Sequence, residues 1–232
     1  MIPEAKDKLG NKKINTTSIK DGKLLYHLTP IKNLESILRN GLKSRSSLEK
    51  ENFIDTANSD IIDKRKQMKL TNYIPFHFMS NGPYDGSVRK TYPDEDFAYI
   101  CVYRDIIKDN CKIIVGHPLN SSVLDNVTLN NLIKNNSVDK NLDKLYDWNE
   151  GFDKINWKLM DEKDYKDRSC KQMCMSEALY LGTITYENIQ CIWVPSDQVS
   201  KFEKIKKELK GKFHIDAKDF LTAENKKNKE NE

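Results

Sequence analysis

The chain has 232 residues and a net charge of +4, with 38% hydrophobic and 32% charged residues. This composition is typical of a globular protein with one hydrophobic core, and it allows an acidic partner such as nucleic acid without requiring one. No apolar run approaches the roughly 18 residues of a membrane-spanning helix, and the N-terminus lacks the apolar stretch of a signal peptide. We therefore expect a cytoplasmic protein with no membrane partner.

The five cysteines have no paired spacing of the kind that marks a disulfide framework, which favours a reducing compartment. Cys170 and Cys174 lie four residues apart without a second ligand pair, so we interpret them as structural thiols and expect no metal. Residues 1–22 are polar and aperiodic and are predicted to be a flexible arm, while residues 218–232 are predicted to be a charged tail. Residues 23–217 are predicted to form one domain.

Residues 24–45, LLYHLTPIKNLESILRNGLKSR, have the clearest local pattern. LLYHL is predicted to be a strand, followed by a helix with Thr29 as N-cap, Pro30 in the first position and Gly41 at the end. The apolar residues of this helix share one face: Leu34, Ile37, Leu38 and Leu42. His27 would lie beside a helix N-terminus, where N–H groups attract phosphates, although a hydrogen-bonded core histidine fits the same pattern.

A short helix is predicted over residues 59–68, SDIIDKRKQM, with Ser59 as its cap. Arg65 shares the inward face of this helix with Ile61, Ile62 and Met68. An inward arginine needs an acceptor, which is either a partner carboxylate or a ligand. The pattern does not distinguish a structural salt bridge from a binding site.

The remaining elements indicate the fold class. NYIPFHFMS (72–80) is predicted to be a strand with His77 and Tyr73 on the face opposite Phe76, followed by a loop, NGPYDGS. FAYICVYRDII, CKIIVG and IQCIWV are predicted to be further strands, residues 119–168 to carry helices and insertions, and residues 199–209 to form a helix. With helices early and late and strands mostly between them, we expect an α+β fold, in which peripheral helices surround a mixed, mostly antiparallel sheet.

Glu177 stands out in SEALYLG, residues 176–182. If residues 173–181 are extended, this carboxylate shares one face with apolar residues: Met173, Met175, Leu179 and Leu181. His27, Arg65 and Glu177 are thus three polar residues set into apolar patterns, although buried opposite charges also pair for structural reasons. The chain contains no GxxxxGK[ST], GxGxxG, HExxH or CxxC motif.

The segment LYHLTPIKNLESILRNGLKS (25–44) resembles the opening of the DarT family of DNA ADP-ribosyltransferase toxins. Further blocks resemble the family in the same order, and the resemblance spans residues 24–200: DIIDKRKQ, NYIPFHF, and YDWNEGFDKINW followed by KQMCMSEALYLGTITYENIQCIWV. It implies an ADP-ribosyltransferase fold, NAD+ as co-substrate and transfer of ADP-ribose to a base of single-stranded DNA, with thymine as the best-known acceptor and guanine in one branch. It also implies control by a DarG macrodomain antitoxin, and we expect a monomer.

The resemblance implies roles for individual residues. Glu177 matches the catalytic glutamate, which stabilises the ribosyl oxocarbenium ion through the ribose 2′-OH. Arg65 matches the second catalytic residue, which would engage an NAD+ phosphate or the acceptor base and help to remove a proton. His27 and Thr29 match residues near the nicotinamide and its ribose. Other matching residues would shape that pocket: Asn33, Leu34, Gly41 and Leu42.

The chain departs from the family pattern on the acceptor side. Residues 81–85, NGPYD, replace an Arg-Ser-Pro-Met-Leu-like turn, and His77 stands where members tend to have tyrosine. His117 and Asn120 only loosely match a Gly-Asn-Ala-like segment. We take Tyr73, Tyr84 and His117 as candidates for contact with the DNA base.

Other functions remain open from the sequence. The chain could modify guanine, RNA or protein, or hydrolyse NAD+ without an acceptor. A non-enzymatic alternative is a degenerate nucleic-acid-binding module, which would require Glu177 and Arg65 to be purely structural.

Overall fold

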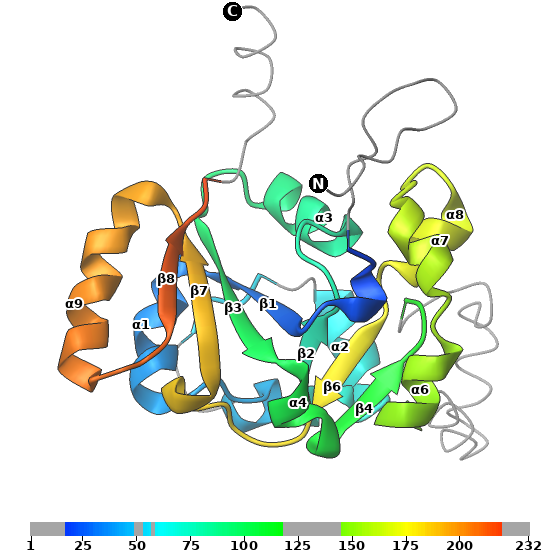
Figure 1. Ribbon diagram of the computed structural model, residues 1–232, viewed down its shortest axis with the longest axis horizontal. Helices are drawn as coiled ribbons and strands as arrows, with labels where there is room; N and C mark the ends of the chain where they lie inside the picture. Colours follow the sequence, from blue (N-terminus) through cyan, green and yellow to red (C-terminus); the bar gives the residue numbers. More distant parts are fainter. Residues whose placement is uncertain (1–16, 49–52, 57–58, 118–144, 220–232) are drawn as a thin grey trace, which may run out of the picture.

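The computed structural model describes residues 17–48, 53–56, 59–117 and 145–219 (Figure 1). Eight strands of this part of the chain form one sheet in the order β5-β4-β6-β2-β1-β3-β7-β8. Their bounds are β1 (Leu24–Pro30), β2 (Ile74–His77), β3 (Phe97–Tyr103), β4 (Cys111–Ile114), β5 (Leu145–Asp147), β6 (Glu177–Tyr180), β7 (Ile189–Val194) and β8 (His214–Ala217). All neighbours pair antiparallel except β7 and β8, which confirms the expected α+β fold with a mixed, mostly antiparallel sheet.

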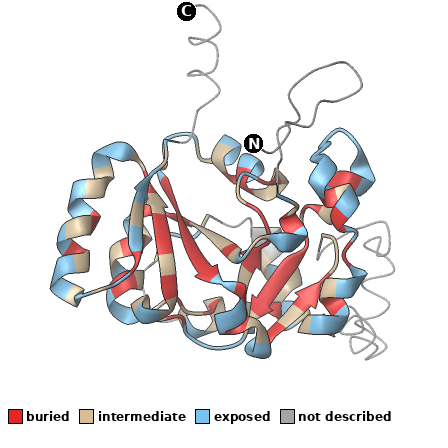
Figure 2. Cartoon of the chain, in the orientation of Figure 1, coloured by how far each residue is buried: buried red, intermediate tan, exposed pale blue. Residues whose placement is uncertain are grey.

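Helices surround the sheet. They are α1 (Ile31–Asn40), α2 (Ser59–Gln67), α3 (Pro83–Thr91), α4 (Arg104–Ile107), α6 (Trp148–Lys154), α7 (Trp157–Glu162), α8 (Arg168–Met173) and α9 (Val199–Leu209). Short 3-10 turns include η1 (Ile19–Asp21), η2 (Arg45–Leu48) and η3 (Leu70–Asn72). α1 and α9 pack on one part of the sheet and α6 and α7 on another, and a continuous buried core joins both parts (Figure 2).

The middle of the sheet opens between β1 and β2. β1 pairs with β3 along its whole length, from Leu24–Tyr103 to Pro30–Phe97. With β2 it shares only one residue pair, Tyr26 and His77. The His27 ring bridges the two strands beyond this pair, because its Nδ1 lies 2.8 Å from the Pro75 carbonyl oxygen. The divergence of the strands leaves room for a pocket.

The start of α1 differs from the prediction. Thr29 is not an N-cap, because β1 continues to Pro30 and Thr29 pairs with Ala98 of β3. Pro30 is the N-cap and makes no side-chain capping bond. Gly41 does end the helix, with the positive φ of 84° that favours glycine.

Two further local predictions are wrong. The expected loop at residues 81–87 contains the start of α3, because Pro83 suits the first helical position and the Asp85 carboxylate accepts a hydrogen bond of 2.9 Å from the Gly82 N–H. The expected strand over 173–181 begins only at Glu177, because α8 continues to Met173. Asp167 caps that helix by accepting from the Cys170 N–H at 2.7 Å.

Other predictions are confirmed or extended. β7 and α9 have the predicted bounds, whereas the parallel strand β8 was not predicted. The end of the expected N-terminal arm packs on the domain through η1, whose Ile19 is buried. All five cysteines are buried free thiols. No helix in the described segments is long and apolar enough to cross a membrane. Asn120 and most of the expected tail lie outside the described residues.

Candidate active site

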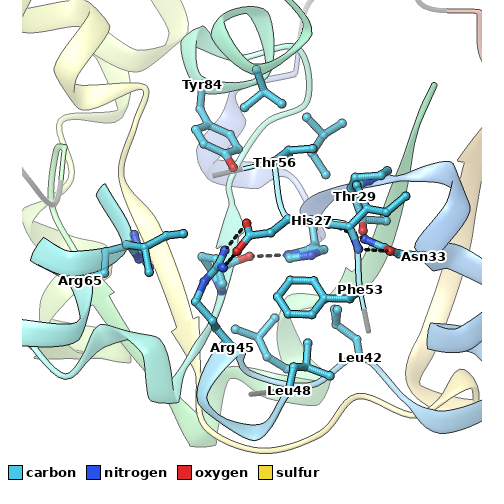
Figure 3. A pocket seen from close by; sticks show the side chains of 18 of the residues that line it. His27, Thr29, Asn33, Leu42, Arg45, Leu48, Phe53, Thr56, Arg65 and Tyr84 are labelled. Atoms are coloured by element: carbon cyan, nitrogen blue, oxygen red, sulfur yellow. Dashed lines mark hydrogen bonds and ion pairs between the residues drawn. The ribbon is translucent and has the colours of Figure 1, made fainter. Parts of the chain in front are cut away.

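A pocket of about 540 Å³ lies where β1 and β2 diverge (Figure 3). Its walls come from β1, α1, η2, residues 53–56, α2, η3, β2, α3 and the start of β6. The volume suits a small-molecule site. Ten residues singled out in the sequence line it: His27, Thr29, Asn33, Gly41, Leu42, Arg65, Tyr73, Tyr84, His117 and Glu177. Leu34 does not line the pocket, because it is fully buried in the core.

Glu177 and Arg65 form a bidentate ion pair inside this pocket. Arg65 Nη1 donates to Oε1 and Oε2 of Glu177 at 3.1 and 3.0 Å, and Nη2 donates to Oε2 at 3.0 Å. Burial alone would raise the pKa of Glu177, but the Arg65 charge outweighs it and the pKa lies below its ordinary value. Burial alone would lower the pKa of Arg65, but Glu177 outweighs it and raises that pKa. Both groups are therefore charged at neutral pH.

His27 lies in the pocket as a neutral imidazole. Burial lowers its pKa from 6.5 to about 4, although the hydrogen bond to Pro75 acts in the opposite direction. A carbonyl can only accept, so Nδ1 carries the proton and donates to Pro75, and Nε2 is left as an acceptor. His27 is therefore a hydrogen-bonded histidine that also lines the pocket, as the prediction of a core histidine allows.

Asn33 closes one wall of the pocket. Its Nδ2 donates to the Ile54 carbonyl at 2.8 Å, and the Ile54 N–H donates to its Oδ1 at 2.9 Å. The side chain therefore holds residues 53–56 against α1 through one donated and one accepted hydrogen bond. Gly41 is required for a different close approach, because a Cβ there would lie 2.5 Å from Thr183 Cγ2.

Aromatic residues lie near Glu177 on the side expected for the acceptor. The Tyr84 ring stacks on His77 with centroids 5.1 Å apart and an angle of 29°. Burial, followed by the charge of Glu177, raises the pKa of Tyr84 to about 12, so its hydroxyl stays protonated. Tyr73 and His117 also line the pocket, and burial lowers the pKa of His117.

The lining residues that were not predicted as site residues include Arg45, Phe53 and His77. Arg45 pairs with Asp55, and its guanidinium lies 5.6 Å from the Phe53 ring centroid. A signal for Arg45 was present, since it directly follows the GLKS block of the resemblance. Among the described residues, no cluster of three or more His, Cys, Asp or Glu could hold a metal ion.

Solved structures with a similar fold are DarT proteins. Thermus sp. 2.9 DarT in complex with ADP-ribosylated ssDNA has a TM-score of 0.61 and 17% identity, covering 84% of this chain and 94% of that chain. The same protein in complex with NAD+ has a TM-score of 0.60 and 14% identity, covering 85% and 96%. Thermosipho africanus DarTG in complex with ADP-ribose has a TM-score of 0.58 and 21% identity, covering 84% of this chain and 50% of that chain.

Sequence comparisons identify the family. No curated protein sequence matches the chain. The family model described as DarT, ssDNA thymidine ADP-ribosyltransferase, matches residues 26–218, which is most of the chain. The solved structures share its fold at low identity. The chain therefore belongs to the DarT family of ssDNA thymidine ADP-ribosyltransferases.

Proposed function

We propose that this chain carries out the reaction of its family in the pocket at β1 and β2, with Glu177 and Arg65 as catalytic residues. NAD+ would be cleaved at the nicotinamide glycosidic bond, and ADP-ribose would be transferred to thymine in single-stranded DNA. The observation that carries this proposal is the buried Arg65–Glu177 pair inside the pocket, at the positions that match the family motifs. In a cell the activity would make the chain a toxin.

Glu177 would stabilise the transition state electrostatically. Loss of nicotinamide leaves positive charge on the ribose C1′, and a carboxylate bonded to the 2′-OH lies next to it. The side chain is only 8% exposed, and limited access of water strengthens its interaction with that charge. Arg65 keeps the carboxylate ionised and fixes its orientation before substrate binds.

Further lining residues of the pocket supply groups for the rest of NAD+. The unprotonated Nε2 of His27 can accept a hydrogen bond from a ribose hydroxyl or the nicotinamide amide. Arg45 and Arg65 bring two guanidinium groups to the pocket, and guanidinium is well suited to phosphate oxygens. Thr29, Gly41 and Leu42 also line the pocket.

Single-stranded DNA is the acceptor that fits this enclosed site. A base can enter the pocket only after leaving its stack, and that costs least in a single strand. Tyr73, Tyr84 and His117 line the side from which it would enter. The similar structures named for ADP-ribosylated ssDNA and for DarTG support single-stranded DNA and a DarG-like antitoxin as partners.

A set of four single-stranded oligonucleotides, each lacking one base type, tests this proposal. The protein is incubated with NAD+ and each strand, and mass spectrometry detects added ADP-ribose. We expect modification of every strand except the one without thymine. Modification of the thymine-free strand would contradict thymine as acceptor, and NAD+ cleavage with no modified strand would indicate a glycohydrolase instead.

A further inference from the structure

The pocket contains three of the four histidines in the chain, and they have different environments. His27 uses Nδ1 to bind Pro75 and belongs to the wall on the β1 side. His117 lies at the end of the segment that follows β4. His77 ends β2 and is the direct cross-strand partner of Glu177 in β6. Side chains that face each other in this way lie about 5 Å apart at Cβ.

The imidazole of His77 is held in place without a hydrogen bond. The residue is 8% exposed and lines the pocket. Tyr84 stacks on its ring at 5.1 Å and thereby restricts its orientation. Among the described residues, none forms a hydrogen bond with this ring. In its neutral form this ring would offer one acceptor nitrogen close to Glu177.

Transfer to a ring nitrogen of a base requires a group that takes a proton. The neighbours of His77 are poor candidates for that task. Arg65 is bonded to Glu177, and its pKa is raised above that of an ordinary guanidinium, so it keeps its protons. The hydroxyl of Tyr84, with a pKa of about 12, is already protonated at neutral pH. Glu177 faces the developing positive charge on the ribose and has a lowered pKa.

We propose that His77 is the general base that takes the proton from the attacking nitrogen of the acceptor base. This inference rests on the proposed function and adds a catalytic residue to it. Its basis is the position of the ring in the pocket, opposite Glu177 in the ladder and stacked on Tyr84.

The step balances without any further reactant. The bond between C1′ of the ribose and the nicotinamide nitrogen breaks, and nicotinamide leaves with the electron pair as a neutral pyridine. A new bond forms between C1′ and N3 of thymine, and the N3 proton moves to the acceptor nitrogen of His77. The imidazolium then releases this proton to water. Without an acceptor base, the same pocket could still cleave NAD+ by reaction with water.

Two variants test this role. His77→Phe keeps an aromatic ring for the stack on Tyr84 but cannot accept a proton. We expect it to fold and to bind NAD+ with unchanged affinity, while transfer to a thymine oligonucleotide falls by about 10²–10⁴-fold, the usual effect of losing a general base. His77→Ala removes the ring, and added imidazole should restore its transfer activity. His27→Ala is the matched control, since imidazole should not restore a lost NAD+ contact.

Unchanged transfer by His77→Phe would overturn the role of His77 but not the proposed function. The same holds if His77→Ala folds but added imidazole does not restore its transfer activity. Absence of DNA transfer by the unmodified protein would instead overturn the proposed function.

Discussion

Arg65 and Glu177, 112 residues apart in the chain, are joined by three hydrogen bonds of 3.0–3.1 Å inside the pocket. The pair connects α2 to the first residue of β6. It also explains how a carboxylate is tolerated beside apolar residues, since its charge is compensated. In the proposed reaction the Glu177 carboxylate would also accept a hydrogen bond from a ribose hydroxyl, so the pair would link stability to catalysis.

Removing one member of this pair should lower stability. Glu177→Gln leaves the Arg65 guanidinium without a carboxylate, and we expect the free energy of unfolding to fall by about 1–3 kcal/mol, less than for a pair sealed from water. The double variant Glu177→Gln, Arg65→Met removes both charges and should recover much of this loss. Urea denaturation measures all of these values. If the losses of the single variants Glu177→Gln and Arg65→Met add up to the loss of the double variant, the pair contributes no coupling.

Asn33 should affect NAD+ affinity indirectly. Asn33→Ala breaks both hydrogen bonds to Ile54 and releases residues 53–56 from α1. We expect a higher Kd for NAD+ because the freed segment must be ordered again on binding. Asn40→Ala, which removes an exposed bond to Ser36 on the same helix, is the control. Equal calorimetric affinities for the two variants would contradict the clamp.

Stability should depend on the protonation of His27. Its pKa is 6.5 when unperturbed and about 4 in the fold, so between these values the unfolded chain binds a proton that the folded chain does not. The contribution of His27 is therefore present above about pH 6.5 and is lost as pH falls toward 4. Thermal unfolding across this range should show a steeper decline for the unmodified protein than for His27→Gln. Parallel curves would argue against a buried neutral imidazole.

Arg104 should anchor the N-terminal turn. Its guanidinium donates to the carbonyls of Ile19, Lys20 and Leu24 at 2.8, 2.8 and 3.3 Å, and it lies 5.4 Å from the Phe78 ring centroid. Lysine cannot reproduce this planar set of donors, and we expect Arg104→Lys to cost about 2–3 kcal/mol. Arg39→Lys, at an exposed arginine, should change little. Equal denaturation midpoints for both variants would refute this anchor.

The sequence was most informative where local pattern and tertiary structure agree. α9 and β7 have unambiguous periods, and the GLKS block with Gly41 marks the end of α1 correctly. The inward side of α2 was predicted from the spacing of Arg65, and its acceptor is now known to be Glu177. Two candidates for a catalytic pair were thus found before their contact was known.

The missed features depend on contacts between distant segments. Residues 81–83 have the composition of a turn, but Pro83 starts α3. The Asp85 carboxylate that caps this helix is held from β3, because the Tyr99 hydroxyl donates to it at 2.6 Å. β8 is short and gains its partner only when the chain returns beside β7. Asn33 was predicted to shape the pocket and does line it, but its pairing with Ile54 could not be predicted from local spacing.

The central claim is that Glu177 drives NAD+ cleavage and transfer to DNA. The most direct measurement follows nicotinamide release and ADP-ribosylation of a thymine-containing single strand together, for the unmodified protein, Glu177→Gln and Glu208→Gln. Glu208, on α9, forms an exposed ion pair with Arg39 of α1 and serves as a matched control. We predict that Glu177→Gln lowers both signals by about 10²–10³-fold or more, as for the loss of an electrostatic stabiliser, and that Glu208→Gln leaves them unchanged. Near-normal turnover by a folded Glu177→Gln variant would contradict the account.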